Sequence, residues 1–272
     1  MAGQQDHWDS GEYQNSASFV AKLAGKVVEW LDLQKDDSVL DIGCGDGILD
    51  LEFSKVVAQG KGSVYGFDSS AAMIEAARKL CSGTNNTTFA VLDGGEISSD
   101  PSLQKGTFTK AFSNAAMHWI LAAPAARETF FRDVHASLVP GGIFAFEMGG
   151  LGNVAEMRTA ILMAAARRIG LDKAKAAEPW FFPDEEWVST AMKEAGFRVD
   201  RVEREWRPTK ADKGGVEGWV RLFGKIVLEQ LDEKDREDVV REAADVLRVV
   251  CKMPGDGEMI SYVRLRAVGT KI

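Results

Sequence analysis

The sequence predicts an α/β fold in which a doubly wound, mostly parallel sheet carries helices on both faces. Three observations favour it. Short β-branched runs alternate with helical patterns through the first half of the 272-residue chain. A glycine-rich turn, Gly43–Gly47, follows the first of those runs. The second half is rich in helical patterns and closes on a segment that alternates apolar and polar residues.

The first strands and helices follow one another through short connections. Ser38–Ile42 predicts a strand, and a helix over Gly47–Ala58 follows it directly. Ser63–Phe67 predicts a second strand. The next helix ends at Leu80, and Ser69–Ser70 can cap its start through a hydroxyl group. This alternating order is typical of a parallel sheet.

Three more strands are predicted before residue 150. Two of them are Thr88–Leu92 and Phe108–Asn114. A helix that begins at Pro124, a residue suited to a first helical turn, leads to the third strand, Ile143–Met148. Pro140–Gly142 predicts a turn just before that strand.

Beyond Gly149 the pattern changes. Asn153–Glu156 has the ends of a capping box, which predicts a helix that Gly170 closes. Phe197–Glu203 alternates like a strand, and Met259–Val268 predicts an exposed antiparallel strand. Amphipathic helices are expected between those two strands. Because no repeat or low-complexity linker divides the chain, we expect a single domain.

The composition argues against several classes of protein. The formal net charge is −8, and no run of lysine or arginine offers a surface to a nucleic acid. No apolar run reaches the roughly 20 residues of a membrane span, and the first residues lack a signal-peptide pattern. The three cysteines form no CxxC pair and the three histidines show no ligand spacing, so we expect no metal site. We therefore expect a cytoplasmic protein.

The segment that suggests chemistry is Asp41–Gly47, which has the form D-x-G-x-G-x-G between a strand and a helix. Glycine adopts positive φ at low cost and lets a ligand approach the backbone. The following helix exposes N–H groups and a partial positive charge, which suit a carboxylate or a phosphate. The turn alone is also compatible with a plain strand-to-helix connection.

Two acids favour a nucleoside ligand. Asp68 follows the second strand, about 20 residues after the glycine turn, where a carboxylate can accept both hydroxyl groups of a ribose. Asp93 follows the third strand and can accept an adenine amino group. Either could be a solvated loop acid, but both follow carboxyl ends of strands, where ligands of open α/β sheets bind.

The glycine spacing distinguishes between two nucleotide ligands. Dinucleotides are bound by G-x-G-x-x-G, whereas this chain has G-x-G-x-G. A dinucleotide also lacks the ammonium group that Asp41, just before the turn, could receive. Adenosine that carries an amino acid is S-adenosylmethionine (SAM).

The motif at Asp41–Gly47 resembles the first motif of class I SAM-dependent methyltransferases. Three further segments resemble the trans-aconitate methyltransferase-like enzymes, which act on small molecules. These segments are Tyr13–Val20, Ser113–Ile120 and Pro179–Phe197. The resemblance implies a Rossmann-like sheet of seven strands with an antiparallel last strand and a helical cap. It implies one methyltransferase domain over 1–272, with an N-terminal helical cap segment (1–35), a SAM-binding core (36–148), and cap helices with the remaining strands (149–272).

The resemblance also implies which residues surround SAM. Those expected near its methionine end are Asp41, Gly43, Gly45, Gly47 and Asn114, with Cys44 as a small filler of the turn. Those expected near its adenosine end are Asp68, Ser69, Met73, Asp93 and Gly94.

The methyl acceptor is predicted to bind just past the fourth strand. His118 could act as a general base, hydrogen-bond a substrate carboxylate or brace the loop. Trp119 could form a wall or donate its indole N–H, and Gln14 could add a donor. The aromatic residues within 180–187 and Trp219 are expected to line the cap side or to join the cap to the sheet.

The predicted reaction is methyl transfer from SAM to a small organic molecule, which leaves S-adenosylhomocysteine (SAH). A carboxylate is ionised at pH 7 and needs only positioning, so carboxylate O-methylation is favoured. Methylation of a hydroxyl or thiol group with His118 as base is the alternative. SAM binding without catalysis is a third possibility. We expect no nucleic-acid or membrane partner and a monomer or homodimer; the identity of the acceptor is left open.

Overall fold

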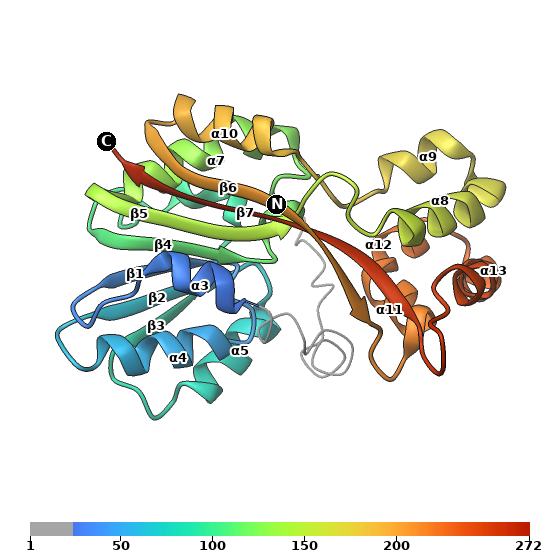
Figure 1. Ribbon diagram of the computed structural model, residues 1–272, viewed down its shortest axis with the longest axis horizontal. Coiled ribbons are helices and arrows are strands. Elements are labelled where there is room, and N and C mark those ends of the chain that lie inside the picture. Colours follow the sequence, from blue (N-terminus) through green and yellow to red (C-terminus); the bar gives the residue numbers. More distant parts are fainter. Residues whose placement is uncertain (1–23) are drawn as a thin grey trace.

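The computed structural model describes residues 24–272. Seven strands form one sheet in the order β3-β2-β1-β4-β5-β7-β6 (Figure 1). β7 is antiparallel to both of its neighbours, whereas the other described pairs are parallel. The predicted fold class is therefore confirmed. The strands are β1 (Ser38–Ile42), β2 (Ser63–Asp68), β3 (Thr87–Val91), β4 (Phe108–Asn114), β5 (Leu138–Gly149), β6 (Phe197–Lys210) and β7 (Met259–Lys271).

Helices cover both faces of the sheet. One face carries α3 (Gly25–Leu31), α4 (Ile48–Val57) and α5 (Ala71–Leu80). The other face carries η1 (Gly94–Ser99), α6 (Met117–Ile120), α7 (Pro124–Ser137) and α10 (Glu185–Glu194).

Strand β1 shows how one short run serves both faces. Val39 packs with Phe53 of α4, whereas its neighbours Leu40 and Ile42 belong to the core on the opposite face. Successive side chains of a strand point to opposite faces, so a strand buried on both sides carries apolar residues at consecutive positions. The described part of segment 1–35, helix α3, packs on the sheet against β5 and β7, where a cap segment was predicted.

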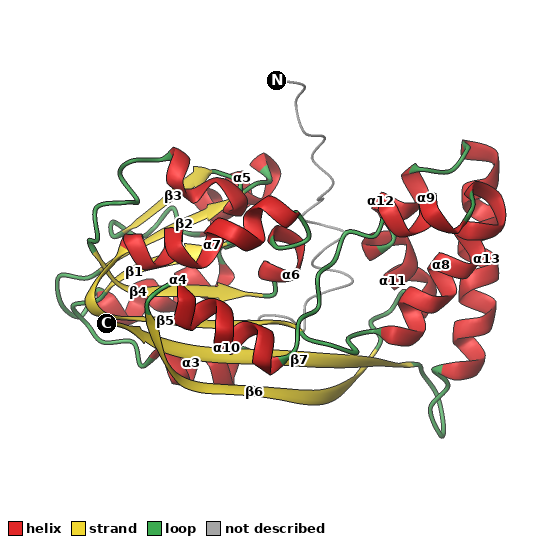
Figure 2. Cartoon of the chain, turned by 90° about the horizontal axis from the view of Figure 1, so that it is seen from above, coloured by secondary structure: helices red, strands yellow, loops and turns green. Residues whose placement is uncertain are grey.

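A group of helices beyond one end of the sheet forms the cap (Figure 2). It has its own hydrophobic cluster, which includes Ile161, Val220 and Leu247. Strands β6 and β7 continue from the sheet to the cap, and Ile260 and Tyr262 of β7 join that cluster. The cap helices are α8 (Ala155–Ile169), α9 (Leu171–Ala176), α11 (Gly215–Phe223), α12 (Lys225–Glu229) and α13 (Glu233–Val250). Within 24–272, no helix has both the length and the apolar character that crossing a bilayer requires.

The prediction that Met259–Val268 forms an exposed strand was wrong about exposure. β7 lies between β5 and β6, and Arg264 and Arg266 are only 4% and 2% exposed. Their guanidinium groups bind the buried carboxylate of Glu147 on β5, with Nε–O distances of 2.9 and 2.5 Å. The polar positions of the alternating pattern therefore face charged partners rather than water.

The capping-box prediction was also wrong. Val154 occupies the N-cap position of α8, and no side chain caps this helix. Instead, Asn153 Oδ1 accepts the N–H of Val263 at 2.9 Å, and Glu156 Oε1 accepts the N–H of Ser261 at 2.7 Å. Both side chains thus bind β7, which a local pattern cannot indicate.

The predicted turn at Pro140–Gly142 lies inside β5. Phe108 of β4 pairs with Leu138, but Lys110 pairs with Ile143, so the extra residues of β5 form an irregularity within the strand. The pairing of β4 with β5 resumes beyond it and brings Asn114 opposite Glu147.

We expect the Glu156→Ala substitution to lower the free energy of unfolding by about 1–2 kcal/mol, because it removes a charged acceptor from the Ser261 N–H. Chemical denaturation would measure this loss. Glu156→Gln keeps an acceptor and should recover most of it. Glu52→Ala, which removes an exposed ion pair with Lys55, is the matched control and should cost under about 0.5 kcal/mol. Equal effects of the two alanine substitutions would contradict the assignment.

Candidate active site

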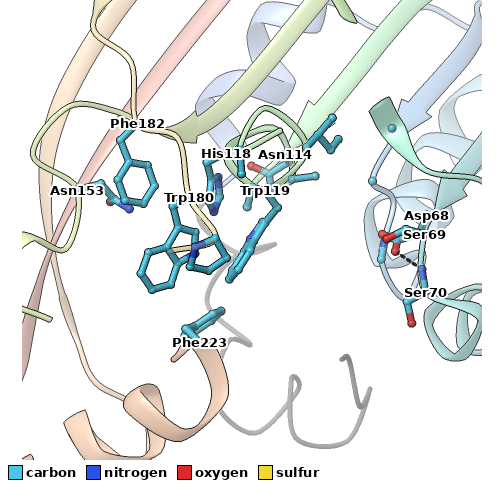
Figure 3. A pocket seen from close by; sticks show the side chains of 18 of the residues that line it. Asp68, Ser69, Ser70, Asn114, His118, Trp119, Asn153, Trp180, Phe182 and Phe223 are labelled. Carbon is cyan, nitrogen blue, oxygen red and sulfur yellow. Dashed lines mark hydrogen bonds between the residues drawn. The ribbon is translucent and has the colours of Figure 1, made fainter. Parts of the chain in front are cut away.

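A cavity lies at the carboxyl ends of β1 and β4, where the strand order reverses, and extends to the cap (Figure 3). Its volume is about 430 Å³. Ten of the residues predicted from the sequence line it: Gly43, Gly45, Asp68, Ser69, Met73, Asp93, Gly94, Asn114, His118 and Trp119.

Four predicted site residues are not among the described residues that line the cavity. Asp41, Cys44 and Gly47 belong to the first motif but are not among the residues that line the cavity. Gln14 lies outside the described residues, so its predicted contact with the acceptor stays a prediction.

Two glycines of the first motif are required for different reasons. Gly43 has φ +74°, and a Cβ at this position would lie 2.2 Å from Cβ of Ala116, in the segment that follows β4. Gly45 has φ +57°, but a Cβ there would meet no atom within 4 Å. Gly43 thus permits close packing of two loops, and Gly45 leaves backbone open toward the cavity.

Asp68 joins the turn after β1 to the end of β2. Its Oδ2 accepts the N–H of Gly45 at 3.0 Å, and its Oδ1 accepts the N–H of Ser70 at 2.9 Å. The hydroxyl of Ser70 accepts the N–H of Met73 at 3.2 Å, so the predicted cap of α5 is confirmed. Two backbone donors thus fix the orientation of a carboxylate on the cavity wall.

Asn114 offers a second fixed acceptor. It lines the cavity between Asp68 and His118 (Figure 3), and its buried Oδ1 accepts no hydrogen bond from residues 24–272. The next residue, Ala115, has φ +59°, a strained value for a residue with a Cβ. An acceptor left over in a buried site is suited to a ligand that carries N–H donors.

Asp41 lies behind the first motif, together with Asp50 of α4. Both side chains are buried, at 2% and 0% exposed, and neither oxygen of Asp50 has a hydrogen-bond partner among residues 24–272. Burial raises the pKa of Asp50 to about 7, and burial followed by the charge of Asp50 raises the pKa of Asp41 as well. Burial and mutual repulsion therefore favour the protonated form of both groups beneath the turn.

His118 is held as a neutral ring. It is 7% exposed, and its Nδ1 accepts the N–H of Gly149 at 3.4 Å. Burial, and then the charge of nearby Arg264, keeps the pKa of His118 well below its usual range. Because Nδ1 is an acceptor, the ring proton is on Nε2, which makes that atom a donor.

Aromatic rings form the cap side of the cavity. Trp119 lies edge-on to Trp180, with ring centroids 5.5 Å apart, and stacks near Phe223 at 6.4 Å. Trp180 also stacks on Phe182 at 6.1 Å. Of the predicted aromatic set, Trp180, Phe182 and Trp219 line the cavity, whereas Phe181 and Trp187 pack on each other beside the α7 core.

Sequence reasoning missed several lining residues. They come from the cap and from strands β6 and β7, and they include Asn153, Arg207, Phe223, Tyr262 and Arg264. Two features of the sequence could have indicated them. Glu147 is an isolated acid in an apolar strand, and the last strand carries arginines spaced two apart.

The residues present fit SAM. The unmatched oxygen of Asn114 suits its ammonium group, and Asp68 offers a carboxylate of fixed orientation to its ribose. The open backbone at Gly45 leaves room for the methionine part.

Comparison with known proteins shows similarity to methyltransferases. A family model described as a methyltransferase domain matches residues 39–142. The chain is 36% identical to an uncharacterised methyltransferase of Schizosaccharomyces pombe, over 98% of this chain and 99% of that protein. It is 32% identical to trans-aconitate 2-methyltransferase of Pseudomonas paraeruginosa, but over only 29% of this chain and 28% of that enzyme.

Solved structures show the same fold. A putative methyltransferase from Bacillus halodurans superimposes with a TM-score of 0.61 at 13% identity, over 92% of this chain and 99% of that one. The chain therefore belongs to the class I SAM-dependent methyltransferases, and its cofactor is SAM.

We expect the Asp68→Ala substitution to weaken SAM binding at least tenfold, or about 1.4 kcal/mol, because it removes the ribose acceptor and frees the Gly45 N–H. Calorimetric titration with SAM would measure the affinity. Asp36→Ala is a matched control, since Asp36 also accepts a backbone N–H, that of Lys61, but is not among the cavity-lining residues. Unchanged affinity in Asp68→Ala would remove the ribose assignment.

We expect the stability of the free protein to fall as pH rises through about 7, because the raised pKa of Asp50 favours the protonated, folded form at lower pH. Asp50→Asn should remove about 1 kcal/mol or more of this decline between pH 5.5 and 8.5. Urea denaturation at both pH values would measure it. Glu52→Gln, on the exposed side of the same helix, should leave the decline unchanged. An identical decline in Asp50→Asn would contradict the raised pKa of Asp50.

Proposed function

We propose that this methyltransferase transfers the methyl group of SAM to a carboxylate of a small organic acid. The observation that carries the proposal is the state of His118, the histidine on the cavity wall. Its Nδ1 accepts the Gly149 N–H and burial keeps the ring neutral, so Nε2 donates a hydrogen bond rather than accepting a proton. An acceptor that is already ionised needs a donor here and no base.

The cavity suits an anionic acceptor for a second reason. Bound SAM supplies a methyl group on a positively charged sulfur. Attack by a carboxylate neutralises charge, so a water-poor site favours the transition state over the separated ions. The rings of Trp119, Trp180 and Phe182 provide such surroundings, and His118 can hold one carboxylate oxygen while the other attacks.

The size of the cavity favours a small molecule. A volume of about 430 Å³ lies within the usual range of small-ligand sites, and it has to hold SAM as well. The Pseudomonas relative is named for transfer to trans-aconitate, which supports an organic acid as the acceptor class. The net charge of −8 favours a free metabolite over a nucleic acid.

Incubation with methyl-labelled SAM and a panel of small organic acids should yield a product that releases labelled methanol in mild base, as a methyl ester does. His118→Gln, which keeps an N–H donor, should retain kcat within about tenfold, because loss of a general base costs about 10²–10⁴. His135→Gln is the matched control, since His135 packs on Phe197 in the core and not on the cavity.

A base-stable label combined with a kcat loss above a hundredfold in His118→Gln would contradict this proposal. That result would identify a hydroxyl or thiol acceptor, with His118 as its base. No labelled product from any acid or metabolite extract, despite tight SAM binding, would indicate a SAM-binding protein without catalysis.

A further inference from the structure

The charges on the cavity wall are divided between its two ends. Among the described lining residues, the carboxylates are those of Asp68 and Asp93, both at the cofactor end. The guanidinium groups are those of Arg207 on β6 and Arg264 on β7, at the end that leads to the cap. A neutral His118 lies near Arg264. The half left for the acceptor therefore carries the positive charge.

Three arginines share one buried carboxylate at this end of the cavity. Glu147, whose side chain is 1% exposed, contacts three arginines: Arg207 at 3.1 Å, Arg264 at 2.9 Å and Arg266 at 2.5 Å. Arg266 also contacts Glu203 and Glu205, at 3.1 and 2.5 Å. Among residues 24–272, Arg264 contacts no carboxylate other than that of Glu147, which it shares with Arg207 and Arg266.

Arg264 is positioned to bind more than Glu147. It is 4% exposed and uses Nε for Glu147, while its two terminal nitrogens make no hydrogen bond to residues 24–272. A guanidinium group this deeply buried needs acceptors for its remaining donors, and water or a ligand in the cavity can supply them. Its planar set of donors matches the two oxygens of a carboxylate or phosphate.

Neutral donors surround the same spot. The indole of Trp219 donates to the hydroxyl of Tyr262 at 2.7 Å, which orients that hydroxyl on the cavity wall beside Arg264 on β7. Asn153, which also lines the cavity, is fixed by its bond to Val263 of the same strand. Hydrogen-bonding groups of fixed orientation therefore lie beside Arg264.

We infer that Arg207 and Arg264 form an anion subsite that binds an acidic group of the methyl acceptor other than the group that is methylated. This inference rests on the proposed function in one respect only, namely that the cavity holds a small-molecule acceptor. It makes the acceptor a molecule with at least two functional groups, a dicarboxylic acid or a phosphorylated acid, and it makes Arg264 a determinant of specificity.

The test uses SAH-loaded protein and calorimetric titration with succinate, glutarate and adipate, each compared with its monoamide. At least one diacid should bind tenfold or more tightly than its monoamide, because the amide cannot accept a charged pair of hydrogen bonds. Arg264→Gln should reduce that ratio to about twofold or less while leaving SAH affinity within about twofold. Arg167→Gln, at an exposed arginine of α8, is the matched control and should change neither value.

Further arms separate the sources of the anion. Phosphono analogues of the three acids are titrated in the same way. If these analogues bind more tightly than the diacids, the acceptor carries a phosphate group, and the subsite is retained. If Arg264→Gln does not fold, Arg264→Lys is measured instead. Lysine keeps the positive charge but lacks the planar set of donors, so the ratio of diacid to monoamide affinity should fall at least threefold.

Three outcomes would overturn the inference. They are equal binding of every diacid and its monoamide, an unchanged ratio in the Arg264 variant, and a tenfold loss of SAH affinity, which would assign Arg264 to the cofactor's own carboxylate. The chemistry of the product is separate. A base-stable product would overturn carboxylate methylation and leave the anion subsite standing, whereas an ester with an unchanged ratio would overturn the subsite alone.

Discussion

A single buried carboxylate, that of Glu147, holds three strands together at the point where two of them leave the sheet. Burial alone would raise the pKa of Glu147, but Arg264, Arg207 and Arg266 outweigh it and keep the group ionised. A buried charge of this kind is stable only while its partners are in place. The positions of β6 and β7, and through them the cap and the acceptor half of the cavity, therefore depend on this ion cluster.

The two halves of the cavity use different physical means. Near the first motif, backbone geometry decides: Gly43 and Gly45 shape the turn, and Asp68 is oriented by two amide groups. Next to the cap, large rings line the wall and buried charges set the polarity. Low polarity near the rings strengthens every charged contact that an acceptor makes there.

The parts of the fold that depend on local chemistry could be predicted. The glycine turn, the cap of α5 at Ser70 and the alternation of strands and helices all follow from neighbouring residues. Contacts between distant residues could not be. Asn153 has the residue type of a helix cap, yet its partner is Val263. The arginines of β7 look solvent-exposed because Glu147, which neutralises them, is more than a hundred residues away.

The order of the lining residues along the chain has an evolutionary consequence. Among the described residues, the wall next to the first motif comes from positions 43–123, which include His118 and Trp119, and the wall next to the cap comes from positions 153–264. The two stretches meet near Gly149, at the end of β5. The wall next to the cap can therefore change by recombination or drift downstream of one boundary, while the glycine turn and Asp68 are inherited intact. Glu147 lies just before that boundary and pairs with arginines beyond it, so any exchanged segment has to bring matching cations with it.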